Sequence, residues 1–226
     1  MLWHNAQFKG EFYMKTLYPL ISFNKKELDE FKRCFQPTEK QYSRGDVIMR
    51  LDSFNRSVAL LTKGMAQLTT TTFDGTRTIV DYYEPGSVFG RNISPISETD
   101  PYIITAKTKC TVLTADYDRS MHCCERRCEK HIQLMDMVMR SVVKRAQLHV
   151  EVLGKRSIRG KLLTFFRQVA QGKGTRTFVL PLSLSDLADY ISADRSAMMR
   201  EMKKLNDEKI IVSHAKKITL LRDISI

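Results

Sequence analysis

A group of polar side chains near the C-terminus has the chemistry needed to contact nucleic-acid bases. Arg195, Met199 and Lys203 follow at four-residue spacing, as do Ser196 and Arg200 beside them, so a helix would display all five on one face. An arginine can donate two hydrogen bonds to a guanine edge, which is the commonest specific contact in the major groove of DNA. The spacing therefore predicts a surface that contacts duplex DNA.

Two short helices must hold this face. The first is expected over Leu184–Ile191, where Ser183 and Asp186 form a capping box ahead of apolar residues at helical spacing. After a two-residue break, Asp194 is the N-cap candidate of the second helix. Ser185 and Asp194, near the two helix starts, are further candidates for DNA contact. The second helix would bury three apolar residues beneath its polar face: Met198, Met202 and Leu205.

A basic hairpin is expected to follow the two helices. Ile210–Val212 and Ile218–Leu220 are short apolar runs that flank a turn containing Lys216 and Lys217. Lysines at a hairpin tip can lie against phosphates. The stretch Leu182–Leu221 thus has the pattern of a helix-turn-helix with a β wing. The alternative is a small amphipathic helix pair whose charges are only solvated.

A second group of reactive side chains lies near the middle of the chain. Cys124, Cys128 and His131 occupy positions i, i+4 and i+7, so they share a helix face and are weak candidates for a soft metal or an oxidant. The two-pair spacing that is typical of zinc sites is absent. Inert thiols without a metal are the favoured interpretation, and a redox or metal sensor is the alternative.

Charge is concentrated at the C-terminal end. The 226 residues carry a formal net charge of +12, and residues 155–226 hold 15 Lys+Arg against 7 Asp+Glu, which is +8. Positive charge of this density favours the phosphate backbone of nucleic acid, although an acidic protein or a membrane surface would also attract it. The 42% hydrophobic content suits one large domain or two modest ones.

Targeting signals are missing from the sequence. No run approaches the roughly 20 apolar residues of a transmembrane helix, and the N-terminus lacks the pattern of a signal peptide. Five cysteines, an odd number, suggest reduced thiols. We therefore expect a cytoplasmic protein that does not contact a membrane.

Short strands are expected between Gln41 and Asp116, separated by turn signals such as Asp74-Gly75. The candidate strands are Val47–Met49, Ser57–Leu61, Ala66–Thr69, Thr78–Tyr82, Ile103–Ala106 and Cys110–Leu113. Strands this regular predict an antiparallel barrel or sandwich. The sequence has no His-x-His pair there and no catalytic acid–base pair, nucleophile with a partner or metal triad, so an enzyme is disfavoured.

A long helix is expected to follow, from Cys124 to Leu153. One apolar stripe is typical of a coiled-coil seam: Ile132, Met135, Met139, Val142, Ala146, His149 and Leu153. A second stripe could pack on the barrel: Leu134, Val138, Leu148 and Val152. Two stripes favour a homodimer. The alternative is one helix buried in its own domain.

The order of barrel, long helix and winged helix-turn-helix resembles the Crp/Fnr family of bacterial transcription regulators. The resemblance covers nearly the whole chain and is carried by these segments: Gly45–Ile48, Lys63-Gly64, Asp74-Gly75, Pro85–Gly90, Asp186–Tyr190, Asp194–Ser196 and Arg200. It implies an α+β fold with a jelly-roll β-barrel of the cyclic-nucleotide-binding type over residues 1–122, a dimerisation helix over 123–154 and a winged helix-turn-helix DNA-binding domain over 155–226. RNA polymerase is an implied partner.

The resemblance also implies an effector pocket in the barrel. Family members hold a cyclic phosphate with Gly-Glu after the Phe and with a later Arg, whereas here Arg91 replaces the Glu and Asp100 falls on the Arg position. Because these charges are reversed, we do not expect the usual response to cyclic AMP. Arg91 could hold a carboxylate ligand or only pair with Asp100. The other pocket candidates are Gly86, Phe89, Gly90, Asn92, Ala146 and Gln147.

These patterns favour a homodimeric, sequence-specific regulator of transcription. It would bind a near-palindromic operator in double-stranded DNA and respond to a small-molecule effector, not yet identified, at the barrel, with no cofactor. Many family members carry Glu after the first arginine, where this chain has Ser196, so the operator should differ from the best-known one. The alternative is a small-ligand or redox-sensing module that acts through protein contacts.

Overall fold

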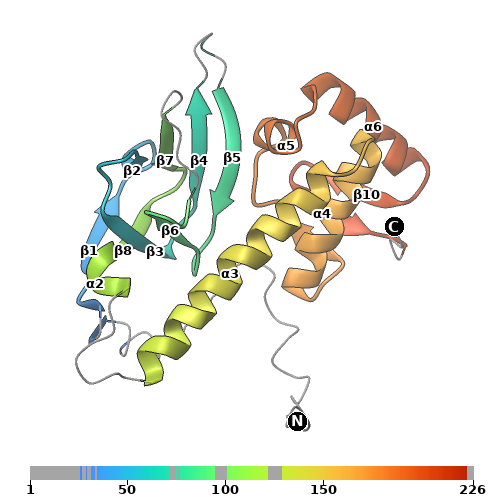
Figure 1. Cartoon of the computed structure of the whole chain (residues 1–226). Coiled ribbons are helices and arrows are strands. Elements are labelled where there is room, and N and C mark those ends of the chain that lie inside the picture. The colour runs from blue at the N-terminus through green and yellow to red at the C-terminus, as the bar shows by residue number, and fades with distance from the viewer. Residues whose placement is uncertain are drawn as a thin grey trace, which may run out of the picture.

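The computed structural model describes residues 26, 29, 32, 33, 35–71, 75, 77–94, 101–121 and 129–222. They form an N-terminal β domain, a long helix and a C-terminal helical domain with a small sheet (Figure 1). This is the α+β order that the sequence predicts. The described residues between 26 and 35 are helical.

The β domain consists of two four-stranded antiparallel sheets. One has the order β1 (Thr38–Tyr42), β8 (Cys110–Asp116), β3 (Ser57–Lys63) and β6 (Val88–Gly90). The other has the order β2 (Val47–Leu51), β7 (Tyr102–Ala106), β4 (Ala66–Thr71) and β5 (Arg77–Tyr83). A shared apolar core joins the sheets. All six predicted strands occur, and β1 and β6 are additional. A short helix, α2 (Tyr117–Met121), follows β8.

Gly90 fixes the close approach of β6 to β3. Its φ is +125°, a conformation that L side chains rarely adopt, and a Cβ there would lie 2.3 Å from the carbonyl oxygen of Ser57. The adjacent Phe89 is completely buried and packs against Tyr83, with 4.8 Å between ring centroids. The Phe-Gly pair is thus explained by packing alone.

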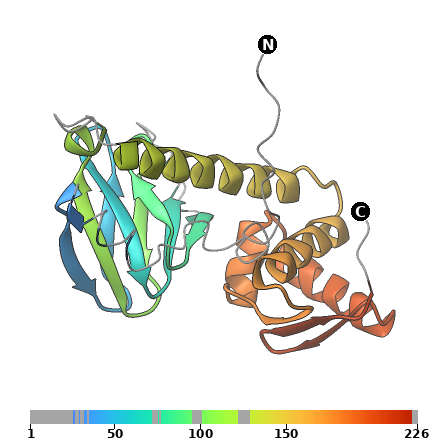
Figure 2. The same cartoon turned by 90° about the horizontal axis from the view of Figure 1, so that it is seen from below.

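The long helix α3 (Glu129–Leu153) joins the two halves of the molecule. Figures 1 and 2 both show it running along the β domain and on to the C-terminal domain. Val138 packs with residues of the β domain, whereas Leu148 and Val152 belong to the core of the C-terminal domain. The second predicted stripe is therefore buried where its side chains are described. That of Leu134 lies outside the description.

The first predicted stripe differs from the structure in part. Three of its members are partly buried against the chain itself, namely Met135, Val142 and His149. Met135 packs on the β domain, and His149 stacks on Tyr190. The exposed apolar face of α3 consists instead of Ile132, Met139, Val143, Ala146, Val150 and Leu153. Val143 and Val150 were not predicted. The register shifts because α3 packs against its own chain along a face adjacent to the exposed one.

The C-terminal domain begins with α4 (Ile158–Lys173), capped by the Ser157 hydroxyl. A three-stranded sheet of order β10-β11-β9 and two more helices complete it. Their bounds are β9 (Thr177–Val179), α5 (Leu184–Tyr190), α6 (Arg195–Asp207), β10 (Ile211–His214) and β11 (Lys217–Leu220). Ile79 and Tyr82 of β5 join the core of this domain, so the two domains are packed together. No helix among the described residues is long and apolar enough to cross a membrane.

Candidate nucleic-acid interface and β-domain cavity

Two capped helices build the helix-turn-helix. The Ser183 hydroxyl accepts a hydrogen bond from the Asp186 amide at 3.1 Å, and the Asp194 carboxylate accepts one from the Ala197 amide at 2.8 Å. Between the helices, Ser192 adopts a left-handed φ of 50°. Both predicted caps are present because short polar side chains satisfy the free N–H groups at a helix start.

The two faces of α6 separate as the spacing predicts. Met198, Met202 and Leu205 are buried. The predicted DNA contacts on the opposite face are all exposed: Arg195, Ser196, Met199, Arg200 and Lys203. Ser185 is exposed on α5. The structure thus brings the candidates onto accessible surface, and their contact with DNA stays a prediction.

An ion-pair clamp, which sequence reasoning missed, holds α6 on α4. Arg159 lies 2.7 Å from Glu201 and 2.5 Å from Glu208. These hydrogen bonds raise the pKa of Arg159 and lower that of Glu208. Arg159 offsets one of the two negative charges of Glu201 and Glu208, and it holds both carboxylates toward α4. The exposed face is therefore left with a basic character.

The wing is a tight hairpin between β10 and β11. His214 pairs with Lys217, and Ala215 in the turn has a left-handed φ of 52°. Lys216 and Lys217 are both exposed, as a phosphate contact requires. Lys216 has a second feature, since its side chain also lines a cavity between the two domains.

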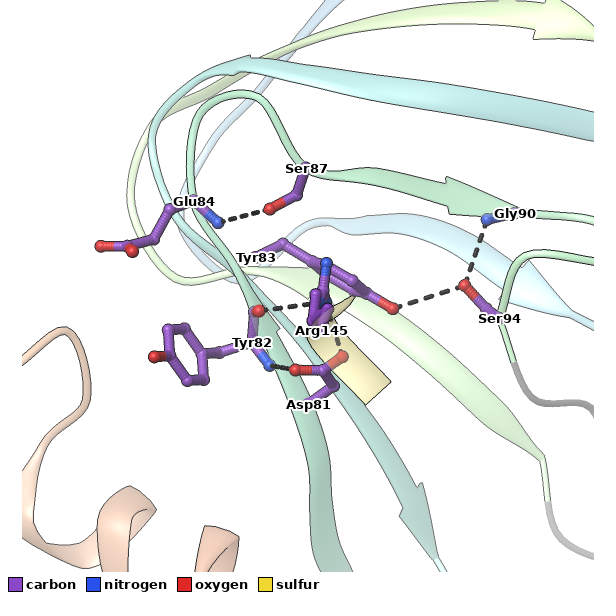
Figure 3. Close-up of polar contacts among 8 residues, drawn as sticks. All are labelled: Asp81, Tyr82, Tyr83, Glu84, Ser87, Gly90, Ser94 and Arg145. Atoms are coloured by element: carbon purple, nitrogen blue, oxygen red, sulfur yellow. Dashed lines mark hydrogen bonds and ion pairs between the residues drawn. The ribbon is translucent and has the colours of Figure 1, made fainter. Parts of the chain in front are cut away.

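A cavity of about 240 Å³ lies between the β domain and α3; we call it the α3 cavity. Its lining is mostly apolar, with Leu68, Val80 and Val88 on the strands and Val142, Ala146 and Val150 on the helix. Figure 3 shows some of its polar groups, with Arg145 of α3 reaching Asp81 and the backbone of Tyr82.

Arg145 is held on three sides. Its guanidinium lies 2.6 Å from the Asp81 carboxylate, donates to the Tyr82 carbonyl at 3.2 Å and stacks over the Tyr83 ring at 4.0 Å. Burial raises the pKa of Tyr83 to about 12, so its hydroxyl stays neutral beside Ser94. The Arg145 cation is neutralised by Asp81, which disfavours a phosphate in this cavity.

The predicted pocket residues lie in different places. Ala146 lines the α3 cavity. Arg91 does not line it, because its guanidinium donates to the Asn55 carbonyl at 3.4 Å and lies over the Tyr117 ring. Gln147 is exposed and outside the lining. Asp100 falls outside the described residues, so an Arg91–Asp100 pair remains a prediction.

Gly86, Phe89, Gly90 and Asn92 shape the strands and turns beside the cavity. Gly86 and Asn92 have positive φ values of 94° and 57°. The Gly90 amide donates to the Ser94 hydroxyl at 3.2 Å. None of these four residues lines the α3 cavity. Phe89 packs in the core of the β domain, and the other three set the course of the backbone.

Five polar residues do line the cavity, and sequence reasoning did not assign any of them to a pocket: Asp81, Tyr83, Ser94, Arg145 and His149. A usable signal was Arg145 itself. It lies at helical spacing between Val138 and Leu148, on the stripe expected to be buried. A basic residue in an apolar stripe requires an acidic partner.

Only one of the three metal candidates lies within the described residues. Cys124 and Cys128 fall outside them, and His131 is buried with its ring 5.0 Å from that of Phe35. No group of three metal-ligating side chains occurs in the described part of the chain. His131 therefore packs beside Phe35, and the redox or metal hypothesis stays a prediction.

Comparison with known proteins now identifies the two domains. Residues 39–127 match the cyclic nucleotide-binding domain, and residues 160–223 match the Crp-like helix-turn-helix domain. The chain belongs to the Crp/Fnr family of transcription regulators. As a Crp/Fnr protein, it is a DNA-binding transcription regulator from a family of regulators rather than enzymes.

Relatives of this Crp/Fnr protein match along most of the chain. It is 26% identical over 210 residues to the nitrogen fixation regulation protein FixK of Bradyrhizobium diazoefficiens. The matched region covers 91% of this chain and 86% of FixK. The fold is similar to that of FixK2 from Bradyrhizobium japonicum, with a TM-score of 0.63 and 19% identity over 82% of this chain and 93% of that one. The fold is also similar to that of a CooA mutant from Carboxydothermus hydrogenoformans, with a TM-score of 0.70 and 15% identity. The match covers 90% of this chain and 94% of the CooA chain.

Proposed function

We propose that this regulator binds, as a homodimer, a near-palindromic operator whose bases are read by α6. The observation that carries the proposal is the exposed face of α6. Arg195 and Arg200 lie in its first two turns, above a buried apolar face and beside a helix start capped by Asp194. The start of a recognition helix is where base edges are met in the major groove.

The exposed apolar face of α3 supports the dimer. Val143 and Val150 are 51% and 69% exposed, although both are fully apolar and one helical repeat apart. A second copy of the same helix would bury this face in a symmetric interface. Two-fold symmetry then places the two α6 helices over half-sites about 34 Å apart.

The α3 cavity supports a signal other than cyclic AMP. Asp81 already neutralises Arg145, the cation that lines it, and the surrounding walls are largely apolar. A small, mainly apolar molecule fits this lining better than a cyclic phosphate does. Such a ligand would favour one of two arrangements of the DNA-binding domains.

Selection from a random duplex library at two salt concentrations tests the operator. We expect a two-fold symmetric motif. Arg195→Ala and Arg200→Ala should each cost about 1–3 kcal/mol and relax the preference at one base pair in each half-site. Lys217→Ala should weaken binding to every sequence alike and reduce the salt dependence.

Arg50→Ala is the matched control, since Arg50 is an exposed arginine on β2 of the other domain. It should leave the motif and the affinity unchanged. If Arg195→Ala and Arg200→Ala weakened binding equally on all sequences, α6 would contact only phosphates, and base reading by this face would be wrong.

A further inference from the structure

A second cavity lies between the β domain and the C-terminal domain, and it shares no lining residue with the α3 cavity. It measures about 350 Å³, and we call it the interdomain cavity. Turns of the β domain form one wall, and the start of α5 with the wing forms the other. Its polar lining residues are Arg44, Gln67, Tyr82, Lys107, Thr108, Ser183, Asp186 and Lys216.

Hydrogen bonds in the backbone fix both walls. The Lys107 amide donates to the Met65 carbonyl at 2.8 Å, which ties two turns of the β domain together. On the opposite side, the Leu180 amide donates to the Lys216 carbonyl at 2.8 Å and holds the wing turn in place. The cavity is therefore a formed site and not a gap between loose loops.

The lining carries an excess of positive charge. Arg44, Lys107 and Lys216 face a single carboxylate, that of Asp186, which leaves two positive charges in excess. Lys107 is 3.6 Å from Asp186, whereas Arg44 and Lys216 form no ion pair within the described residues. Although burial opposes it, the hydrogen bond with Ser183, the nearby Gln67 amide and the charge of Lys107 hold the pKa of Asp186 below its usual value.

Gln67 is the second, independent observation. The residue is 1% exposed, and neither side-chain atom of its amide makes a hydrogen bond of good geometry to a described residue, although the amide lies close to Asp186. A buried amide left in this way is costly unless a ligand or a water completes its hydrogen bonds. Its oxygen requires a donor such as a hydroxyl group.

We propose that the interdomain cavity binds a phosphate monoester that carries hydroxyl groups, of the size of a sugar phosphate. Arg44, Lys107 and Lys216 neutralise the phosphate dianion, and a hydroxyl of the ligand donates to Gln67. The cavity volume exceeds what phosphate alone would fill. The proposal is independent of the operator and of the ligand of the α3 cavity.

Binding here would join the domains. The phosphate would touch Arg44 and Lys107 on the β domain and Lys216 on the wing, so it would hold the C-terminal domain in the arrangement seen here. It would also engage a lysine that is otherwise available to DNA. A metabolite with this chemistry would thereby change the affinity of the protein for duplex DNA.

Calorimetric titration of the full chain tests the site, with ribose 5-phosphate, inorganic phosphate and ribose as probes. We expect one ribose 5-phosphate per chain, weaker binding of inorganic phosphate and none of ribose. Arg44→Gln and Lys216→Gln should each weaken ribose 5-phosphate by about tenfold, the effect of removing one charged hydrogen bond. Gln67→Met should weaken ribose 5-phosphate but not inorganic phosphate.

Matched controls are Arg50→Gln and Lys217→Gln, which remove the same charges outside the lining. Both should bind the probes as the unaltered chain does. Arg44→Gln changes an exposed turn residue, so it stays informative if Gln67→Met fails to fold. The proposal is overturned if ribose 5-phosphate does not bind, or if the control variants weaken it as much. It also fails if Lys216→Gln weakens binding to duplex DNA but leaves the binding of ribose 5-phosphate unchanged.

Discussion

At the scale of single residues, Arg145 decides which ligands the α3 cavity can accept. Asp81 neutralises it, so an anion must compete with a carboxylate 2.6 Å away. We expect cyclic AMP to leave the DNA affinity of the unaltered protein unchanged. Asp81→Asn removes the competing charge and should increase the affinity for small anions, measured by calorimetry with cyclic AMP as the probe.

Asp136→Asn is the control for this change, because it removes an exposed carboxylate of α3 that pairs with Arg140. It should not affect the binding of anions. Tight binding of cyclic AMP by the unaltered protein would show that the Asp81 carboxylate does not prevent an anion from binding in the α3 cavity.

His149 should make the stability of the protein depend on pH. Burial lowers its pKa below the usual 6.5, while Asp81 and the Tyr190 carbonyl oppose this and Arg145 adds to it. The unfolded chain therefore binds the proton more readily. The stabilisation is complete above the usual value and is lost as the pH falls from 6.5 toward the lowered pKa.

His149→Phe keeps a ring to stack on Tyr190, 4.3 Å away, and removes the titration. We expect its free energy of unfolding to change less than that of the unaltered chain between about pH 7 and pH 5. Urea denaturation at a series of pH values measures this. His214→Asn, at an exposed wing position, should retain the original slope. Parallel curves for His149→Phe would contradict the assignment.

Local chemistry explains which residues could be predicted from the sequence. Ser183 and Asp194 cap helices whose free amides lie within three residues, so their pattern is contained in a short stretch. The partner of Arg145 lies 64 positions away, on β5. Pairing across that separation depends on the tertiary fold, and the apolar stripe indicated only that some partner was needed.

At the scale of elements, α3 has two adjacent apolar faces, one for its own chain and one exposed. Periodicity locates both, but it does not say which residues at their border turn inward. Met135, Val142 and His149 lie at that border, and the packing of the β domain and of α5 decides their direction. For the same reason the predicted coiled-coil seam did not include Val143 and Val150.

The exposed face gives a direct test of the dimer. Val143→Glu and Val150→Glu would place carboxylates in an apolar interface, which is unfavourable without a partner charge. We expect each to raise the dimer dissociation constant by about tenfold or more, measured by sedimentation equilibrium. The monomer should stay folded because both side chains are exposed.

Lys144→Glu is the matched control, since it adds a carboxylate on the same helix outside the apolar face. It should leave the dimer intact. If all three variants behaved alike, the exposed face of α3 would not be the interface, and the half-site spacing expected from a two-fold dimer would lose its basis.

At the scale of the whole molecule, the two domains share one core. Tyr82 is 1% exposed and makes edge contacts with Tyr190 of α5 and Phe165 of α4, at 5.4 and 6.4 Å between ring centroids. Figure 3 shows its ring directed away from Arg145, toward the C-terminal helices. One strand thus contributes Asp81 and Tyr83 to the α3 cavity and Tyr82 to the DNA-binding domain, because successive side chains alternate in direction.

This alternation predicts that the domains lose stability together. Tyr82→Ala removes a buried ring at the junction and should cost about 3–5 kcal/mol, the range for large aromatic side chains. Native-state hydrogen exchange should then show lower protection in β5 and equally in α4 and α5. The reason is that the space left by the Tyr82 ring would border both domains. Tyr42→Ala, a partly exposed ring of β1, should lower protection in the β domain alone. Were Tyr82→Ala to affect only β5, the C-terminal domain would be a separate folding unit, and a ligand in the α3 cavity could not act on α5 through this strand.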